Sequence, residues 1–292
     1  PWPTSVAGAT ERCAPWQQCL HDEAADHAAI ERVREHIRAG DCYQVNLTTR
    51  LASRLQVPLH ALFLALHAAQ PGGFSLYLEA AGVASCSPEL FFDWRALPEH
   101  ARTWLASAQP MKGTAPRGSE RASDEAAQQQ LRTSEKERAE NLMIVDLMRN
   151  DIGRVAAVGS VTVTSLLAVE SYAHVHQLVS TVRGVLADGL TGIDAIAACF
   201  PAGSMTGAPK RSATLILDSL EQRARGIYSG AFGYVGLDGA IDLAMVIRSI
   251  VVDGAGSTVG TGGGITALSD PGEELAEARL KAAALLRVLG VR

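Results

Sequence analysis

The sequence predicts a mixed α/β fold in which several helices accompany antiparallel β-structure. Apolar residues recur close to the helical period within 134–155, which predicts a helix of about four turns. Residues 41–51 instead alternate apolar and polar side chains, the pattern of a half-buried strand. Two apolar runs flank Asp238-Gly239, a dipeptide typical of a β-hairpin turn. With 292 residues, of which 47% are hydrophobic, the chain is long enough to bury a large core.

Composition and charge argue against several classes of protein. The net charge of -5 and the pI near 5.9 give no sign of nucleic-acid binding, and no dense basic stripe with interleaved aromatic residues is present. The five cysteines show no CxxC spacing, so we expect reduced thiols in a cytoplasmic protein and no zinc site. The sequence has no apolar run of about 18 residues and no signal-peptide pattern, so we expect no membrane association.

The first hundred residues are expected to alternate helices and short strands. Ile30, Val33 and Ile37 form an apolar stripe, and Gly40 follows them as a helix end. The prolines and small polar residues that precede this stripe indicate a loosely ordered lead-in. The expected order is a lead-in over 1–25, a helix over 26–39, a strand over 41–51, a helix over 58–70, and three short strands within 74–94 with a turn at 85–89.

The rest of the chain continues this mixture. Residues 119–133 are polar and Gln-rich, typical of an exposed helix or a mobile lid. Pro209 lies where a helix is expected to begin, with Thr206 as a candidate cap. Arg248 is an isolated charge in the apolar strand expected over 241–253, and we expect it to meet an anion. The other expected elements are two strands within 161–186, separated by a turn with His174 and His176, and a last helix within 269–286.

Two pairs of glutamates at helical spacing are candidates for a metal site. Glu137 and Glu140 share one face of the four-turn helix, and Glu274 and Glu277 repeat the spacing on the last helix. If these helices pack together, four carboxylates converge, and Mg2+ is the hard cation that suits them. An alternative stays open, because Ser134 and Glu137 also form a helix capping box and such glutamates are commonly solvated.

Lys112 and three glycines are candidate contacts for an anionic ligand. Lys112 precedes a glycine in MKGTAPRG, on a loop restrained by prolines where its amine can face a pocket. An isolated lysine of this kind is also commonly an ordinary surface residue. Gly262, Gly263 and Gly264 can form a backbone nest that binds an anion.

Six motifs in a fixed order resemble those of the chorismate-utilising enzymes. This family includes anthranilate synthase component I, aminodeoxychorismate synthase component I, and the isochorismate and salicylate synthases. One motif could match by chance, but six in the same order, over about residues 26–290, do not. The motifs are SPEL at 87–90, MKGTAPRG at 111–118, RAENLMIVDLMRNDIGRV at 138–155, FPAGSMTGAPK at 200–210, RGIYSGAFGY at 225–234, and GTGGGIT at 260–266 followed by SDP.

The resemblance implies a fold and a magnesium-chorismate site. The fold is a single α/β domain over 26–292, with two facing antiparallel sheets and outer helices, and the lead-in is the remnant of an upstream region. Glu140 and Glu277 match glutamates that ligate Mg2+ in the family. Glu137 and Glu274 match those that support the metal, directly or through water.

The resemblance also assigns a proton donor and substrate contacts. Glu89 matches the general acid that protonates the departing C4 hydroxyl of chorismate. The residues that match the substrate site are Gln44, Thr114, Ser204, Tyr228, Arg248, Gly262, Gly263 and Gly264.

Three positions separate the branches of the family. Members that add water at C2 have a lysine base at the place of Gln44, and glutamine cannot act as that base. Anthranilate synthases usually have AGT where this chain has Lys112-Gly113-Thr114, whereas KGT resembles aminodeoxychorismate synthase component I. In that branch the lysine attacks C2 as C4 loses its hydroxyl. Gln177 stands where anthranilate synthases tend to have a histidine tied to pyruvate elimination.

The resemblance further implies substrates, a partner and competing functions. Chorismate and ammonia would be combined into 4-amino-4-deoxychorismate, on the route to 4-aminobenzoate and folate. No cysteine lies in a GxCxG motif, so ammonia would come from a separate glutamine amidotransferase subunit or from solution. The competing functions are anthranilate synthase component I and a non-catalytic, chorismate-binding regulatory subunit.

Overall fold

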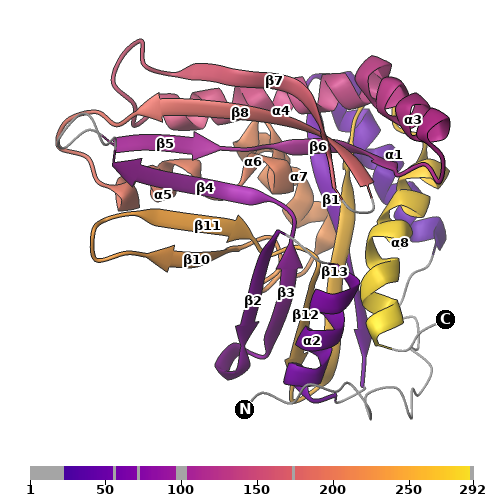
Figure 1. Ribbon diagram of the computed structural model, residues 1–292. Helices are drawn as coiled ribbons and strands as arrows, with labels where there is room; N and C mark the ends of the chain where they lie inside the picture. Colours follow the sequence, from indigo (N-terminus) through magenta and orange to yellow (C-terminus); the bar gives the residue numbers. More distant parts are fainter. Residues whose placement is uncertain (1–22, 55–56, 71–72, 97–103, 173–174, 290–292) are drawn as a thin grey trace.

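Figure 1 shows the computed structural model of the chain, which describes residues 23–54, 57–70, 73–96, 104–172 and 175–289. These residues form two antiparallel sheets with helices packed against them, which confirms the expected fold. The lead-in expected over 1–25 lies almost entirely outside the described residues, as does His174.

The first sheet has six strands in the order β2-β3-β12-β13-β1-β9. β1 and β13 form its centre and pair from Val45 opposite Ile265 to Ser53 opposite Ser257. The strands are β1 (Gln44–Ser53), β2 (Phe74–Leu78), β3 (Val83–Ser87), β9 (Gly207–Ala208), β12 (Ser249–Asp253) and β13 (Gly256–Ile265).

Four helices bury the apolar side of this sheet. The helices α2 and α8 pack on β12 and β13 through Leu62, Ile250, Val259 and Leu285. The helices α1 and α7 pack on β1 toward the other end of the strands, around the fully buried Val45. The four helices are α1 (Glu23–Ala39), α2 (Leu59–Ala69), α7 (Lys210–Glu221) and α8 (Pro271–Val288).

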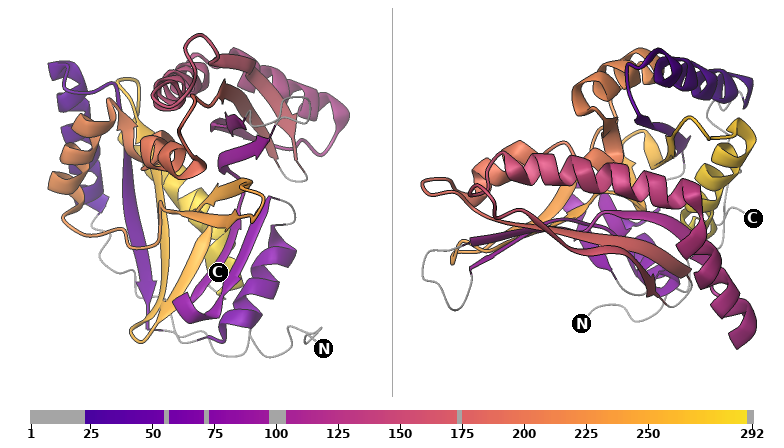
Figure 2. Two further views of the ribbon diagram at one scale, coloured as in Figure 1. Left: turned by 90° about the vertical axis from the view of Figure 1, so that its left-hand side faces the viewer. Right: turned by 90° about the horizontal axis from the view of Figure 1, so that it is seen from above.

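The second sheet has seven strands, in the order β10-β11-β4-β5-β8-β6 with β7 paired to β8. The long helix α4 lies along β7 and β8, as the right-hand view of Figure 2 shows, and buries Ile144, Met148 and Ile152 in the largest core cluster. The strands are β4 (Leu90–Ala96), β5 (Trp104–Ala108), β6 (Met111–Pro116), β7 (Thr162–Ser171), β8 (Val175–Val185), β10 (Ala231–Val235) and β11 (Ile241–Met245).

The remaining helices are α3 (Arg121–Thr133), α4 (Glu135–Gly153), α5 (Gly192–Cys199), α6 (Gly203–Thr206) and a single 3-10 turn, η1 (Glu79–Ala81).

Local chemistry explains where several helices begin. Ser134 caps α4, where its side chain accepts a hydrogen bond from the backbone N-H of Glu137. Asp270 caps α8 in the same way, with Pro271 in the first turn. The prediction that Thr206 caps α7 is wrong, because its hydroxyl donates back to the carbonyl of Ala202 at 3.0 Å.

The polar segment 119–133 contains the helix α3, which begins at Arg121 and is held to the second sheet by a buried histidine. His176 is fully buried on β8, and its ring nitrogens lie 2.8 Å from Ser171 Oγ and 2.8 Å from Asp124 Oδ1 of α3. His176 is therefore a packed residue that joins α3 to β8. None of the helices in the described ranges has an apolar stretch long enough to cross a bilayer.

The single strand expected over 241–253 is two strands that belong to different sheets. β11 ends at Met245 in the second sheet, and β12 begins at Ser249 in the first. Arg248 stands in the corner between them with φ +48, a conformation that breaks an extended strand. The turn expected at 85–89 is also shorter, because β3 continues to Ser87. The chain thus passes between the two sheets at Arg248.

Candidate active site

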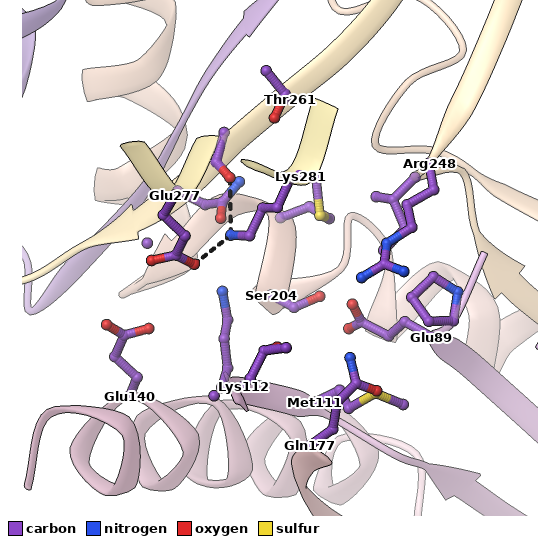
Figure 3. A pocket seen from close by; sticks show the side chains of 18 of the residues that line it. Glu89, Met111, Lys112, Glu140, Gln177, Ser204, Arg248, Thr261, Glu277 and Lys281 are labelled. Atoms are coloured by element: carbon purple, nitrogen blue, oxygen red, sulfur yellow. Dashed lines mark hydrogen bonds and ion pairs between the residues drawn. The ribbon is translucent and has the colours of Figure 1, made fainter. Parts of the chain in front are cut away.

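A cavity of about 130 Å³ lies where the two sheets meet, and segments far apart in the sequence form its walls. Strands β1 and β13 of the first sheet contribute, together with β6 and β8 of the second and the helices α4, α6 and α8. Figure 3 shows the side chains that point into it. Four acidic and three basic residues line the cavity: Glu89, Glu137, Glu140, Glu277, Lys112, Arg248 and Lys281.

Lys112 lies on β6 and reaches into the middle of the cavity (Figure 3). The pairing of β6 with β8 shifts register between Met111 and Thr114, and Gly113 has φ +93. A bulge of this kind re-aims a side chain relative to a regular strand. A Cβ on Gly113 would lie 2.9 Å from Glu137 Oε2, so glycine also lets β6 approach α4. The predicted pocket lysine therefore stands on a bulged strand.

Glu89 occupies the turn between β3 and β4 at the end of the cavity opposite Glu140 (Figure 3). Its side chain is buried, and burial raises the pKa of its carboxyl. The Ser204 hydroxyl of α6 donates to this carboxyl, and the nearby charges of Lys112 and Lys281 also act to lower the pKa without cancelling the effect of burial. A glutamic acid that keeps its proton to a higher pH than an ordinary carboxyl is better suited to donate it.

Glu137 and Glu140 stand together on the face of α4 that looks into the cavity. Burial raises the pKa of Glu140 to about 7; the charges of Lys112 and Lys136 oppose this shift, and those of Glu137 and Glu274 reinforce it. The pKa of Glu137 is raised too, first by burial and then by repulsion from Glu277. Two adjacent carboxyls whose pKa values stay raised beside these lysines indicate a place that can accept further positive charge.

Glu274 and Glu277 on α8 lie differently, although their spacing is the same. Glu277 lines the cavity with a side chain that is 45% exposed, and it forms an ion pair with Lys281 at 2.7 Å, which lowers its pKa despite partial desolvation. Glu274 is buried outside the cavity wall and forms an ion pair with Lys136 at 2.8 Å. The structure therefore brings three of the four predicted carboxylates to the cavity and places the fourth behind them.

The carboxylates at this end have the chemistry of a magnesium site. Within the described ranges, no three His, Cys, Asp or Glu side chains lie close enough to hold a metal ion among them. Mg2+ commonly takes only one or two protein carboxylates and completes its shell with water and substrate oxygens. Glu140 and Glu277 face each other across this end of the cavity in Figure 3, and both offer hard oxygen ligands. The donor set therefore fits Mg2+ bound together with a carboxylate ligand.

Arg248 and Tyr228 form the far wall of the cavity. Burial lowers the pKa of Arg248, and among the described residues no carboxylate forms an ion pair with it; its Nη1 donates to Gln70 Oε1 at 3.3 Å. Tyr228 lies on Gly260, where a Cβ would come within 2.3 Å of the ring. A desolvated guanidinium without an acidic partner is suited to bind the carboxylate of a ligand.

The three glycines predicted to form a nest are instead regular strand residues of β13. They pair with β1, Gly263 opposite Leu47, and none has the positive φ that a nest requires, so the nest prediction is wrong. Gly262 and Gly264 line the cavity, whereas Gly263 faces Glu274 on α8. This alternation follows from the two-residue period of a strand.

Gln44 lies beside the cavity, where the glycine at 264 leaves room for it. A Cβ on Gly264 would lie 2.1 Å from Gln44 Nε2 and 3.4 Å from Lys112 Nζ, so the amide and the amine are neighbours. Gln44 is 1% exposed, and both its amide atoms lack a hydrogen-bond partner within the described structure. An unpaired buried amide costs free energy, which a polar ligand could recover.

Thr114 and Gln177 line the cavity from neighbouring strands, opposite each other in the pairing of β6 with β8. The sequence analysis missed Lys281, whose amine donates to the carbonyl of Gly262 at 3.1 Å as well as binding Glu277. Its spacing of four residues from Glu277 on the last helix was the signal that could have found it.

Comparison with known proteins gives consistent matches over most of the chain. The family model described as chorismate binding enzyme matches residues 9–287. The aminodeoxychorismate synthase of Streptomyces pristinaespiralis is 47% identical over 262 residues, which cover 89% of this chain and 36% of that protein. Anthranilate synthase component 1 of Thermus thermophilus is 44% identical over 263 residues, which cover 89% of this chain and 55% of that protein.

Solved structures show the same architecture. The crystal structure of anthranilate synthase component I from Streptococcus pneumoniae TIGR4 matches with a TM-score of 0.81 and 30% identity, over 92% of this chain and 58% of that one. The chain therefore spans between about a third and somewhat over half of the length of these proteins.

Proposed function

The chain belongs to the family of chorismate binding enzymes, and we propose that it aminates chorismate at C4 to give 4-amino-4-deoxychorismate. The observation that carries this proposal is the position of Lys112, which reaches into the cavity from the β6 bulge. The resemblance of KGT to the aminodeoxychorismate synthase branch adds support, as does the 47% identity to a protein of that name.

The charges of the cavity suit a substrate with two carboxylates. Arg248 has no acidic partner among the described residues and can bind one of them, with Tyr228 beside it. At the other end, Glu140 and Glu277 are the residues that would hold Mg2+, which when bound supplies positive charge for the second carboxylate. The ring would then lie over Lys112, between the two anchored ends.

In the first step, the nitrogen lone pair of Lys112 forms a bond to C2 of the ring. The ring double bonds shift, the C4-O bond breaks, and Glu89 gives its proton to the leaving hydroxyl, which departs as water. The buried carboxyl of Glu89 is prepared for this role because burial raises its pKa. The products of the step are a lysine adduct and an ionised Glu89.

In the second step, ammonia forms a bond to C4 and the double bonds shift back. The C2-N bond to Lys112 breaks, which returns the amine, and the excess proton of the incoming ammonia returns to Glu89. The sum is chorismate plus ammonia giving 4-amino-4-deoxychorismate plus water. The enolpyruvyl side chain stays on the product, which suits the route to 4-aminobenzoate and folate.

We further propose that a glutamine amidotransferase subunit supplies the ammonia. The chain has no cysteine in a GxCxG motif with which to release ammonia from glutamine itself. Free ammonia at high concentration should then replace the partner in the test tube.

Anthranilate synthesis is the second candidate, because an anthranilate synthase component 1 is 44% identical to the chain. Mass analysis of the products after mixing the protein with chorismate, Mg2+ and excess ammonia separates the two. A product that retains the enolpyruvyl group, and that does not form without Mg2+, supports the proposal. Anthranilate plus pyruvate would establish the second candidate instead, and chorismate binding without turnover would indicate a regulatory subunit.

A further inference from the structure

Arg225, in the segment after α7, uses all five of its N-H groups on other residues of the chain. Nε and Nη2 donate to the two carboxylate oxygens of Glu221 at 2.9 and 2.7 Å. Nη2 also donates to the carbonyl of Asn46 at 2.9 Å. Nη1 donates to the carbonyl of Met205 at 2.6 Å and to Ser229 Oγ at 3.2 Å. A guanidinium has five N-H donors, so this one is fully occupied.

These contacts take the place of a neighbouring strand along the edge of β1. The two-residue strand β9 pairs only with the start of β1. Beyond it, Arg225 binds the carbonyl of Asn46, and Glu221 Oε1 accepts from the backbone N-H and the hydroxyl of Thr48 at 2.9 and 2.8 Å. Arg223 Nη2 donates to the carbonyl of Thr48 at 3.1 Å. Backbone groups at a strand edge require partners, and here side chains supply them.

The atoms that Arg225 holds belong to three walls of the cavity. Asn46 of β1 and Met205 of α6 line it, and so does Tyr228, which precedes the bound Ser229. Ser204, next to Met205, donates to the carboxyl of Glu89. A change in the position of α6 would therefore move the partner of the general acid.

We propose that Arg225 and Glu221 are positioning residues that set the relative places of β1, α6 and the Tyr228 turn around the cavity. Neither side chain lines the cavity, so both act through the residues they hold. The proposal rests on the proposed function, because it takes the cavity to be the chorismate site. The fork of the guanidinium is essential to it, since a lysine can pair with Glu221 but has only three donors on one nitrogen and cannot make all five hydrogen bonds.

The test compares Arg225→Lys with a matched variant elsewhere. The Asp151–Lys210 pair has side chains 5% and 18% exposed, close to the 4% and 15% of Glu221 and Arg225. It also bridges separate segments, because Lys210 Nζ donates to the carbonyl of Cys199 at 2.9 Å, but neither partner lines the cavity. Lys210→Arg is therefore a charge-conserving change in a buried ion pair whose partners do not line the cavity.

Steady-state kinetics of both variants of the whole 292-residue chain give the deciding readout. We expect Arg225→Lys to lower kcat/KM for chorismate by about 30-fold, with a higher KM and a lower kcat, because small misplacements of binding groups are costly. Lys210→Arg should lower the melting temperature and leave both constants unchanged. Wild-type constants in folded Arg225→Lys, or equal losses in both variants that follow their melting temperatures, would overturn the proposal.

Calorimetric binding of chorismate in the presence of Mg2+ keeps this test separate from the proposed reaction. Glu221→Gln retains the oxygen that accepts from Thr48 but weakens the hold on Arg225, so we expect weaker binding than in wild type and tighter binding than in Arg225→Lys. If the wild-type protein forms no aminated product, the proposed function fails. The order of the three chorismate affinities still tests whether Arg225 and Glu221 position the cavity walls. Equal affinities in all three proteins would refute this positioning role.

Discussion

Glu89 and Glu140 stand at opposite ends of one cavity, and burial raises the pKa of both, yet their neighbours differ (Figure 3). Around Glu89, the Ser204 hydroxyl and two lysines act to lower the pKa again. Around Glu140, Lys112 and Lys136 also act to lower the pKa, but the charges of two further carboxylates, Glu137 and Glu274, add to the effect of burial. The comparison teaches that a raised carboxyl pKa can indicate two different roles. A carboxyl without acidic neighbours can donate a proton, whereas carboxyls that repel one another indicate a site for a cation.

Lys112→Ala removes the group that lies between the two ends and should have the largest effect. Without the amine no bond to C2 can form, so we expect amination to fall by about a thousandfold or more. Chorismate binding, measured by calorimetry, should change little because Arg248 and the carboxylate end remain. Arg121→Ala, an exposed substitution on α3, serves as the control. Full activity in Lys112→Ala would rule out the covalent mechanism.

Glu89→Gln tests the isolated carboxyl. The amide matches the shape of the protonated acid but has no acidic proton, so we expect kcat to fall by about 10² to 10⁴. In the wild-type protein, activity should decline as pH rises through the raised pKa of Glu89, and the variant should lose this decline. Below the raised pKa of Glu89 the melting temperature should be preserved, because there a neutral amide replaces a protonated carboxyl. A pH profile that is the same in both proteins would exclude Glu89 as the acid.

Without bound metal, the protein should become less stable as pH rises, because Glu140 is buried beside other carboxylates. Glu140 has an ordinary pKa of 4.5 and a folded-state pKa of about 7, so between these values the folded protein binds more protons than the unfolded chain. The free energy of unfolding should therefore fall by about 2 to 3 kcal/mol from pH 4.5 to above pH 7.

Glu140→Gln should remove most of this dependence of the free energy of unfolding on pH, measured by denaturant titration without metal. Glu135→Gln, an exposed change on the same helix, should leave this dependence as it is in wild type. A wild-type protein whose stability does not fall over this range would contradict the assignment of Glu140 as a buried, crowded acid.

Magnesium binding should respond to the same substitution. We expect Glu140→Gln to weaken Mg2+ binding by at least the roughly 10- to 100-fold that loss of a supporting partner costs at metal sites. In wild type, binding should tighten as pH rises toward 7 and release a proton, which isothermal calorimetry in buffers of different ionisation enthalpy can detect. Unchanged affinity in Glu140→Gln would place the metal elsewhere.

Gly264→Ala should have the smallest effect. The added Cβ would stand 2.1 Å from Gln44 Nε2, the end of a flexible side chain, so Gln44 should move and disturb Lys112. We expect a loss of a few-fold in kcat/KM, of the order of about 1 kcal/mol. Gly254→Ala, where a Cβ would meet nothing within 4 Å, is the matched control. Equal activities in the two variants would show that Gln44 is not held by this glycine.

Periodic patterns predicted more of this molecule than isolated residues did. Helical spacing predicted that Glu137 and Glu140 share one face, because a helix fixes which of its residues lie together, and both line the cavity. That Glu277 joins them depended on the packing of two helices, which the spacing only allowed. The spacing could not tell that Glu274 would be bound by Lys136, since that contact depends on how α4 and α8 pack.

The backbone conformation at two positions could not be predicted from the sequence either. Arg248 looked like part of a strand because its neighbours are apolar, and only the change of sheet at positive φ shows it to be a corner. Gly262 and its neighbours looked like a nest because glycine permits one, but pairing with β1 holds them extended. Tertiary pairing decided both cases.

The most direct test of the account is the intact mass of the protein after mixing with chorismate and Mg2+ in the absence of ammonia. Lys112 should then carry an adduct with the mass of chorismate less one water, and peptide mapping should place it within 111–118. Addition of ammonia should remove the adduct and release the aminated product. A protein that turns over chorismate with ammonia, yet never shows this adduct and keeps its activity as Lys112→Ala, would contradict the account.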